Sequence, residues 1–415
     1  MNTEQIVISL VESYKQIGLK PEDVNQRDFF LSLLSLLLTS KVQRENGAIT
    51  TIVMLIFSKD FGQLPAATTE LTSLQKEIVI NLCQSLNEVN SNKTIDELKC
   101  FIDDNTLPQL DAIEAIRLYQ RVLQRLQRMN VVDLTSRTFS YEEFPSELVI
   151  LTQKLLDGKK PSSLFDPWAN TGEFVCYLAA LTKPTVVTTN SIHQSPTYIK
   201  HMLLIAGVEN AICTADSGDN FPESKQDVCI TVAEPSSKAG VDRERDVVKH
   251  LISCIKKDGS VIALLGKGIL HRKSDTPLRK ELLTKNLVSC IVELPPKLLS
   301  KNTVQLFALV LNNQNANKEV LFIDASNHCQ MQVKLNVLKS VPDLCDLRCS
   351  EEIRFSSIST KQIMKQKEVL LTPGSYQVNV VPDNAITSIN AVREQLIEIQ
   401  ARNDKAMELI DALLK

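Results

Sequence analysis

The feature that most constrains the fold is the alternation of short apolar runs with helical patterns between residues 163 and 325. Strands alternating with helices favour a mostly parallel sheet covered by helices on both faces. The last two runs are joined by a polar segment, which predicts an antiparallel hairpin at the sheet edge. The expected strands are Ser163–Phe165, Thr185–Thr189, Ala211–Thr214, Val228–Ala233, Ser260–Leu265, Val288–Glu293, Leu306–Asn312 and Val320–Ile323. The main expected helices are Pro196–Ala206, Arg243–Lys256 and Thr276–Thr284.

The turn after the first of these strands is the first candidate site. It follows Asp166, contains Asn170 and Gly172, and leads into a helical pattern from Phe174. A strand, a sharp turn and a helix open many nucleotide-binding sheets, which bind ligands at the carboxyl ends of their strands. Gly172 allows close backbone approach, and asparagine tolerates positive φ better than most residues. Taken alone, the same pattern is equally typical of an ordinary structural turn.

Two further segments flank the predicted sheet. Residues 1–135 show helical spacing, as in the run Phe29–Leu38, and predict an all-helical domain that serves as a docking module or a lid. Residues 136–330 form the α/β domain, and 331–415 form a C-terminal segment with a short helix at Ser356–Lys365. Apolar residues recur at roughly heptad spacing over Ile386–Leu414, which predicts a terminal helix. That helix packs either on a partner or on the chain's own N-terminal domain.

Composition narrows the classes of function. The net charge is −3, so contact with nucleic acid requires a local basic patch or a partner. The chain has no apolar run of membrane-spanning length and no signal-peptide pattern, which predicts a cytoplasmic protein. Its 10 cysteines are spread widely, as reduced thiols in a cytoplasm would be. Cys345 and Cys349 have no second Cys/His pair at metal-binding spacing, so we expect no metal site.

Several short motifs occur in the order that one enzyme family shows. They are Asp166-Pro167 with Thr171-Gly172, Lys257–Leu270, Ile291–Pro296, Val320–Ser326 and Leu371–Tyr376. Over residues 140–415 the chain resembles the modification subunit of type I restriction–modification systems, which is an adenine-specific DNA methyltransferase. The resemblance implies a Rossmann-like class I methyltransferase sheet, mostly parallel with an antiparallel edge hairpin. It also implies that S-adenosylmethionine is the cofactor and DNA the substrate. A separate specificity subunit would bind to the predicted C-terminal helix of this chain.

The catalytic turn departs from the family pattern, which is Asn-Pro-Pro followed by an aromatic residue. Here the strand Val228–Ala233 leads into Glu234, Pro235, Ser236 and Ser237. In the family the asparagine accepts hydrogens of the flipped adenine's amine while the aromatic ring stacks on the base. Such stacking contributes about 1–3 kcal/mol per base, and Ser237 lacks a ring. Glu234 carries oxygen acceptors, but they sit one methylene further from the backbone.

The cofactor site also departs from the pattern. By resemblance, the residues that would bind S-adenosylmethionine are Asp166, Pro167, Asn170, Thr171, Gly172, Ser191 and Asp216. Ser191 stands where the family has an acidic residue for the ribose hydroxyls, and Glu173 replaces a glycine of the first turn. Asp166 and Asp216 are equally typical of residues that end strands.

A basic cluster follows the fifth expected strand. It consists of Lys267, His271, Arg272, Lys273 and Arg279. In the resembled family this loop flanks the target-base pocket, which predicts contacts with DNA phosphates. The alternative is a solvated helix start.

Three functions remain open on the sequence. The first is a methyltransferase-fold subunit with weak or lost catalysis that positions DNA and assembles a complex. The second is an active adenine methyltransferase, and the third is a protein adaptor that does not touch DNA. If the alignment with the family holds, Asp166, Ser191, Asp216 and Glu234 should all lie at the carboxyl ends of adjacent parallel strands and line one cleft.

Overall fold

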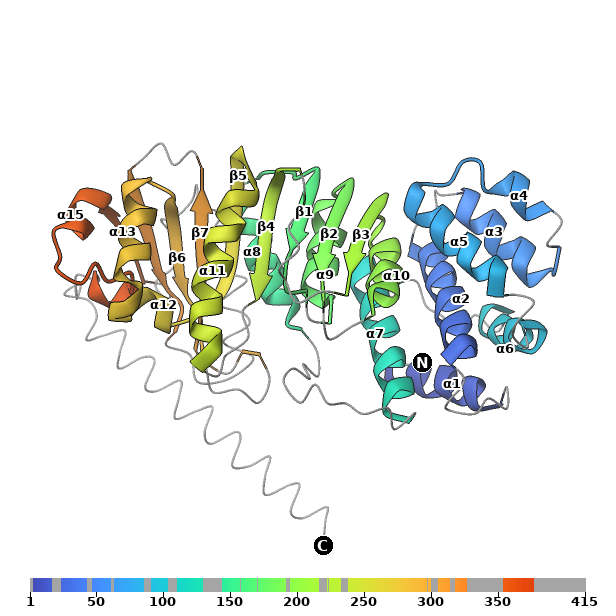
Figure 1. Ribbon diagram of the computed structural model, residues 1–415. Helices are drawn as coiled ribbons and strands as arrows, with labels where there is room; N and C mark the ends of the chain where they lie inside the picture. The colour runs from blue at the N-terminus through green and yellow to red at the C-terminus, as the bar shows by residue number, and fades with distance from the viewer. Residues whose placement is uncertain are drawn as a thin grey trace, which may run out of the picture. The chain divides into compact units, whose positions relative to one another are not determined.

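Helices are the regular elements of the described residues as far as Leu155, and strands alternating with helices follow (Figure 1). The computed structural model describes residues 3–16, 24–42, 47–60, 63–85, 91–103, 110–129, 144–326 and 354–376. Within 144–326 it leaves out residues 157, 170, 192–194, 216–221, 223, 233–237, 297, 300–304 and 314–317. Residues 1–375 form one compact unit, and residues from 376 onward form a second, of which only Tyr376 is described.

The N-terminal helices pack around α2 (Val24–Val42). Every residue from Phe29 to Leu38 is buried, because this stretch is apolar on nearly all sides. Helix α2 contacts α3, α5, α7 and also α10, which belongs to the α/β part of the chain. The other helices are α1 (Thr3–Gln16), α3 (Gly47–Phe57), α4 (Leu64–Ala67), α5 (Ser73–Ser85), α6 (Ser91–Asp103), α7 (Ala112–Met129) and α8 (Ser146–Leu155). The expected helical character of this region is therefore present.

Nine strands of the described chain form one sheet in the order β3-β2-β1-β4-β5-β7-β6-β8-β9. The strands from β3 to β5 run parallel, β7 is antiparallel to both its neighbours, and β9 is antiparallel to β8. Central strands are continuous apolar runs because both of their faces are covered. The bounds are β1 (Ser163–Asp166), β2 (Val186–Asn190), β3 (Asn210–Thr214), β4 (Gln226–Val232), β5 (Ile255–Gly266), β6 (Val288–Glu293), β7 (Leu306–Asn312), β8 (Glu319–Asp324) and β9 (Arg354–Ser359).

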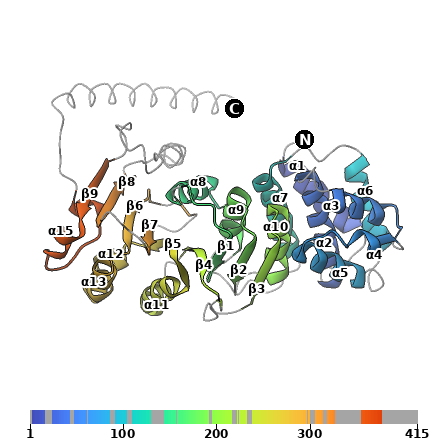
Figure 2. The same ribbon diagram turned by 90° about the horizontal axis from the view of Figure 1, so that it is seen from above.

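Helices lie on both sides of the sheet. Viewed from above, α8 and α9 lie on one side, whereas α11, α12 and α13 lie on the other (Figure 2). The connecting elements are α9 (Glu173–Thr182), α10 (Pro196–Ala206), α11 (Lys238–Cys254), α12 (Gly268–His271), η2 (Lys273–Asp275), α13 (Thr276–Thr284), α15 (Thr360–Met364) and η3 (Pro373–Ser375). The predicted mostly parallel sheet with an antiparallel edge is confirmed.

Two details of the prediction are wrong. The strands β7 and β8 do not pair as a hairpin, because β6 lies between them and β8 runs parallel to β6. The antiparallel edge pair is formed by β8 and β9 instead. The expected helix Ser356–Lys365 begins only at Thr360, since Ser356–Ser359 belongs to β9. The predicted domain boundaries near residues 135 and 330 fall outside the described residues and stay predictions.

A buried polar contact joins the helical region to the sheet region. His201 of α10 is 1% exposed, and its Nδ1 lies 2.6 Å from the hydroxyl of Tyr119 in α7. Its Nε2 lies 3.2 Å from the hydroxyl of Ser32 in α2. Burial lowers the pKa of His201 to about 3, so the ring is neutral at physiological pH. This histidine is a core residue that fixes α2 and α7 on α10.

Candidate functional site

The carboxyl ends of β1 to β4 form the edge where the sequence places its cofactor and catalytic residues. Asp166 ends β1, and Ser191 directly follows β2, the strand beside it. The backbone ties these ends together, since Ala169 N–H donates to Asn190 and Ser191 N–H donates to Thr214. Asn170, Asp216, Glu234, Pro235 and Ser237 lie outside the described residues. Strand β3, which precedes Asp216, lies beside β2, and strand β4, which precedes Glu234, lies beside β1. The strands that lead to these residues are therefore adjacent in the sheet, as predicted.

Asp166 is the most distinctive group at this edge. Its side chain is 1% exposed, and one carboxylate oxygen accepts the backbone N–H of Trp168 at 3.0 Å. Burial raises the pKa of this carboxyl to about 7, although the hydrogen bond from Trp168 acts in the opposite direction. A buried carboxyl with so little compensation would be stabilised by a cationic or hydrogen-bond-donating ligand group.

The turn between Asp166 and α9 is shaped by packing within the protein. Gly172 has a φ of +82°, a conformation that favours glycine. A Cβ at this position would meet side-chain atoms of Ile199 and Met202 of α10 at 3.0 Å. Pro167 is buried and Thr171 is half-buried. The close approach that Gly172 permits is therefore made to α10, and nothing in the turn's packing reserves it for a ligand.

Glu173 takes part in a structural contact. It is 2% exposed, and its Oε2 accepts the backbone N–H of Phe144 at 2.8 Å. Phe144 comes just before α8 and its ring lies 5.0 Å from that of Phe174. The carboxylate that replaces a family glycine thus joins the start of α8 to the start of α9.

A cavity of about 790 Å³ opens on the face of β1 to β3. Its wall includes alternate residues of β2, namely Val186, Thr188 and Asn190, which share one face of the strand. Of the predicted cofactor-binding residues that the structure describes, none lines this cavity. The cavity reaches this edge through Asn190 and Thr214, but Asp166 and Ser191 are not part of its wall.

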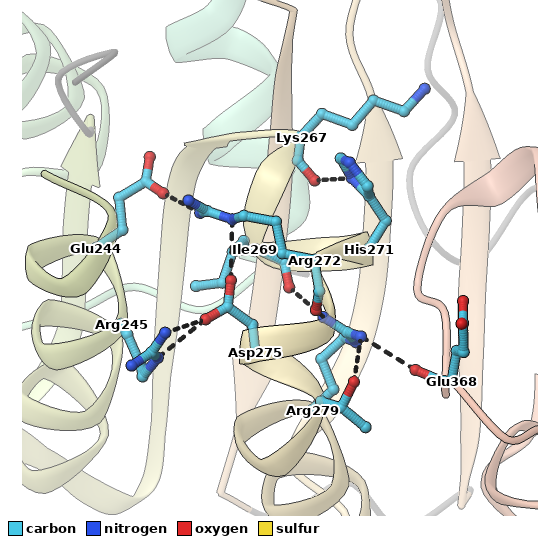
Figure 3. Close-up of polar contacts among 10 residues, drawn as sticks. Glu244, Arg245, Lys267, Ile269, His271, Arg272, Asp275, Arg279 and Glu368 are labelled. Carbon is cyan, nitrogen blue, oxygen red and sulfur yellow. Dashed lines mark hydrogen bonds and ion pairs between the residues drawn. The ribbon is translucent and has the colours of Figure 1, made fainter. Parts of the chain in front are cut away.

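The basic loop after β5, defined as Lys267–Lys273, is held largely by the protein itself (Figure 3). Arg272 forms ion pairs with Glu244 at 2.8 Å and with Asp275 at 3.0 Å. Arg245 of α11 also binds Asp275, at 2.6 Å. Asp275 is fully buried, so this network fixes the loop against α11. Arg272 is thus committed to contacts within the protein.

Arg279 is buried as well, with 1% exposure. Its guanidinium donates five hydrogen bonds, to four backbone carbonyls and the Thr276 hydroxyl. Such a side chain does not reach DNA phosphates, so its placement corrects the expectation that it contacts DNA directly.

The remaining basic residues of the loop are more accessible. The side chain of Lys273 is 86% exposed and lies 3.6 Å from the carboxylate of Glu368. Lys267 is 45% exposed and lies 3.3 Å from Glu293 at the end of β6. Burial raises the pKa of Glu293, while the charge of Lys267 lowers it. His271 is exposed, with its Nδ1 2.8 Å from the carbonyl of Lys267. These three side chains form the accessible basic surface of the loop.

Sequence reasoning missed the acidic partners of the basic loop. Glu244 and Arg245 look like ordinary charged residues at the start of a helix, and Asp275 like a helix cap. The network is not visible in the sequence because Glu244 lies 28 residues from Arg272. One signal was available in the sequence. Glu244 and Arg245 carry opposite charges side by side, on a helix that directly precedes the strand leading into the basic loop.

Comparison with known proteins shows which family this chain resembles. The family model for N-6 DNA methylases matches residues 224–379. A methylase subunit of a type I restriction enzyme from Mycoplasma pneumoniae is 28% identical over 171 residues, which cover 40% of this chain and 31% of that protein. The predicted family resemblance is confirmed. The N-6 DNA methylase match includes β4 to β9 and leaves out β1 to β3, and the chain spans about a third of the curated methylase subunits that it matches.

Solved structures show the same fold. A type I restriction–modification methyltransferase subunit from Streptococcus thermophilus has a TM-score of 0.57 at 15% identity, covering 90% of this chain and 99% of that chain. A modification subunit of a putative type I restriction enzyme from Vibrio vulnificus has a TM-score of 0.58 at 13% identity, covering 86% and 92%. The N-6 DNA methylase resemblance therefore extends to the arrangement of the helices and the sheet.

Two features are absent from the residues that the structure describes. No helix among them is long and apolar enough to cross a membrane. No group of three or more His, Cys, Asp or Glu side chains in that part of the chain is arranged to hold a metal ion. Cys345 and Cys349 fall outside it.

Proposed function

We propose that this chain is a methyltransferase-fold subunit of a type I restriction–modification complex, with weak or lost catalysis, that positions DNA and holds the complex together. The observation that carries the proposal is that the buried side chain of Glu173 bonds to the backbone of Phe144. In the family pattern a glycine stands there, whereas here a buried carboxylate joins two helices of the fold. A turn committed to internal packing is poorly suited to close approach by a cofactor.

The extent of the family match supports the same conclusion. The N-6 DNA methylase model begins at residue 224, close to the start of β4 at Gln226. The strands β1, β2 and β3, whose carboxyl ends would bind S-adenosylmethionine, precede it. A match that leaves out the cofactor half, together with Glu234 and Ser237 in the catalytic turn, supports weak or lost methyl transfer.

The described residues fit S-adenosylmethionine in part. Asp166 would hold the ammonium of the cofactor's methionine moiety, since its buried carboxyl has a raised pKa that a cation would lower. Ser191, in place of an acidic residue, offers one hydroxyl to the ribose where a carboxylate would offer two acceptor oxygens. When bound, the cofactor would supply the methyl group. Among the described residues, Asp166 therefore offers the strongest contact to the cofactor.

Contact with DNA is proposed for the accessible basic surface of Lys267, His271 and Lys273. Three such side chains on a chain of net charge −3 predict weak binding that falls steeply with salt. Specific binding would come from a separate specificity subunit, as the family resemblance implies. The segment Ile386–Leu414, which lies outside the described residues, is the proposed contact with that subunit.

An active adenine methyltransferase is the second candidate, and Asp166 favours it. A buried carboxyl that destabilises the free protein persists where a ligand requires it. In this case Glu234 would accept the hydrogens or the proton of the target amine.

Calorimetric titration with S-adenosylmethionine distinguishes the two candidates. Under the proposed function we expect binding to be weak or undetectable. Tight binding that strengthens as pH rises through 7, with release of a proton, would favour the active enzyme, because an ammonium binds the ionised form of Asp166. Asp166→Asn removes that pH dependence in either case and serves as the control.

Methyl transfer to adenine-containing DNA tests the chemistry directly. With a specificity partner present, we expect no transfer above background and no effect of Glu234→Ala on assembly. Transfer that disappears in Glu234→Ala would overturn the proposal and make Glu234 catalytic. Deletion of residues 386–414 should abolish assembly with the specificity partner, and full assembly of the truncated chain would show that this helix packs internally.

A further inference from the structure

The buried Arg279 joins three segments that are distant in the sequence. It lies on α13, and its guanidinium binds the carbonyls of Ile269 and Arg272 in the basic loop at 2.9 and 2.8 Å. The same group binds the carbonyls of Glu368 and Val369 at 3.0 and 2.8 Å. Figure 3 shows this guanidinium between the loop and Glu368. One side chain therefore holds the basic loop and a segment near the C-terminal end of the described chain.

The segment 368–371, which we call the strap, has further contacts with the loop. Leu371 N–H donates to the carbonyl of Leu270 at 3.0 Å, and Lys273 pairs with the Glu368 carboxylate. Val369 and Leu371 are fully buried, so the strap is packed into the fold. The strap lies in the chain between α15 and η3. The second unit of the chain begins shortly after it, at Tyr376.

The strap contains an unusual backbone conformation. Val369 has a φ of +46°, which a β-branched residue rarely adopts. The surrounding structure must hold such a residue in place, because a free segment would relax to negative φ. The carbonyl of Val369 accepts from Arg279 Nε, so the guanidinium, together with the burial of the Val369 side chain, holds the strained peptide.

We propose that Arg279 is a positioning residue that couples the strap to the basic loop. It sets the loop's place through the carbonyls it binds, while Lys267, His271 and Lys273 face outward. That the loop contacts DNA rests on the proposed function, whereas the coupling of strap and loop does not.

Hydrogen exchange measured on the full-length chain tests the coupling. In Arg279→Gln we expect peptides covering 268–275 and 369–372 to exchange about tenfold faster together, while those of β2 and β3 are unchanged. Arg279→Lys keeps the positive charge but lacks the planar guanidinium that binds several carbonyls at once. Its protection should therefore lie between that of Arg279→Gln and that of the unsubstituted protein. Lys280→Gln is the matched control, since it removes the same charge from an exposed neighbour on α13 and should change neither segment.

A perturbation from the strap side completes the test. Leu371→Ala removes a fully buried side chain from the strap and should raise exchange in 268–275 as well. Met364→Ala, which shortens a 37% exposed side chain of α15, should leave the loop protected. Unchanged exchange of the loop in Arg279→Gln or Leu371→Ala would overturn the coupling, as would an equal rise across the whole sheet. Neither exchange measurement involves DNA, so the proposed function and the coupling fail separately.

Discussion

Replacing Asp166 with asparagine should make the ligand-free protein more stable at neutral and alkaline pH. Asparagine keeps an oxygen that accepts the N–H of Trp168 but has no charge to bury. Burial raises the pKa of Asp166 from 3.8 to about 7. A carboxyl whose pKa is higher in the folded state contributes most to stability when it is protonated, and that contribution is lost as pH rises from 4 to 7.

The size of the effect follows from the pKa. Each pKa unit corresponds to about 1.4 kcal/mol, so ionising Asp166 in the folded chain costs about 4 kcal/mol in total. Part of that cost is already present at pH 5, where the carboxyl of the unfolded chain is ionised. Between pH 5 and pH 8 the free energy of unfolding of Asp166→Asn should therefore rise by about 2–3 kcal/mol relative to the unsubstituted protein.

Urea unfolding of both proteins at pH 5, 6, 7 and 8 measures this difference. Trp168 is the single tryptophan of the chain and lies beside Asp166, so its fluorescence reports the site, while circular dichroism reports the whole fold. Asp246→Asn, at an exposed position of α11, is the control and should show no such trend. A difference between wild type and Asp166→Asn that stays constant with pH would refute the reasoning, because it would mean that the folded protein already compensates the charge.

Three further substitutions test the packing of the site, each followed by urea unfolding. Gly172→Ala should cost about 2–4 kcal/mol, because a left-handed residue gains a Cβ that meets α10 at 3.0 Å; an unchanged stability would mean that the turn relaxes freely. Glu173→Gly should cost about 1–3 kcal/mol by leaving the buried N–H of Phe144 unpaired, without restoring cofactor binding, and tighter cofactor binding would contradict this. Burial lowers the pKa of His201 from 6.5 to about 3, so its contribution is present above pH 6.5 and is lost as pH falls. The unsubstituted protein should lose about 2–3 kcal/mol relative to His201→Gln between pH 7 and 4.5, and equal acid sensitivity of the two proteins would exclude His201 as the cause.

Much of the fold can be predicted from the sequence because its signals are local. Helices α10 and α13 begin and end where the apolar pattern and the prolines at their starts place them. The strands β6 and β7 also match their predicted bounds, since buried strands are continuous apolar runs. The turn after β1 and its glycine were likewise visible, because a sharp turn needs special backbone angles.

The sequence by itself determined the kind and order of the elements. It also determined that Asp166 and Ser191 lie at the carboxyl ends of neighbouring strands. Only the tertiary structure decided that β6 separates β7 from β8, because strand pairing depends on distant partners that no local pattern names. It also decided that Arg279 is buried while Lys273 is exposed, although both belong to one basic cluster. The reason is that a charged side chain's role depends on which carbonyls and carboxylates the fold brings within hydrogen-bonding distance, and these come from segments far apart in the chain.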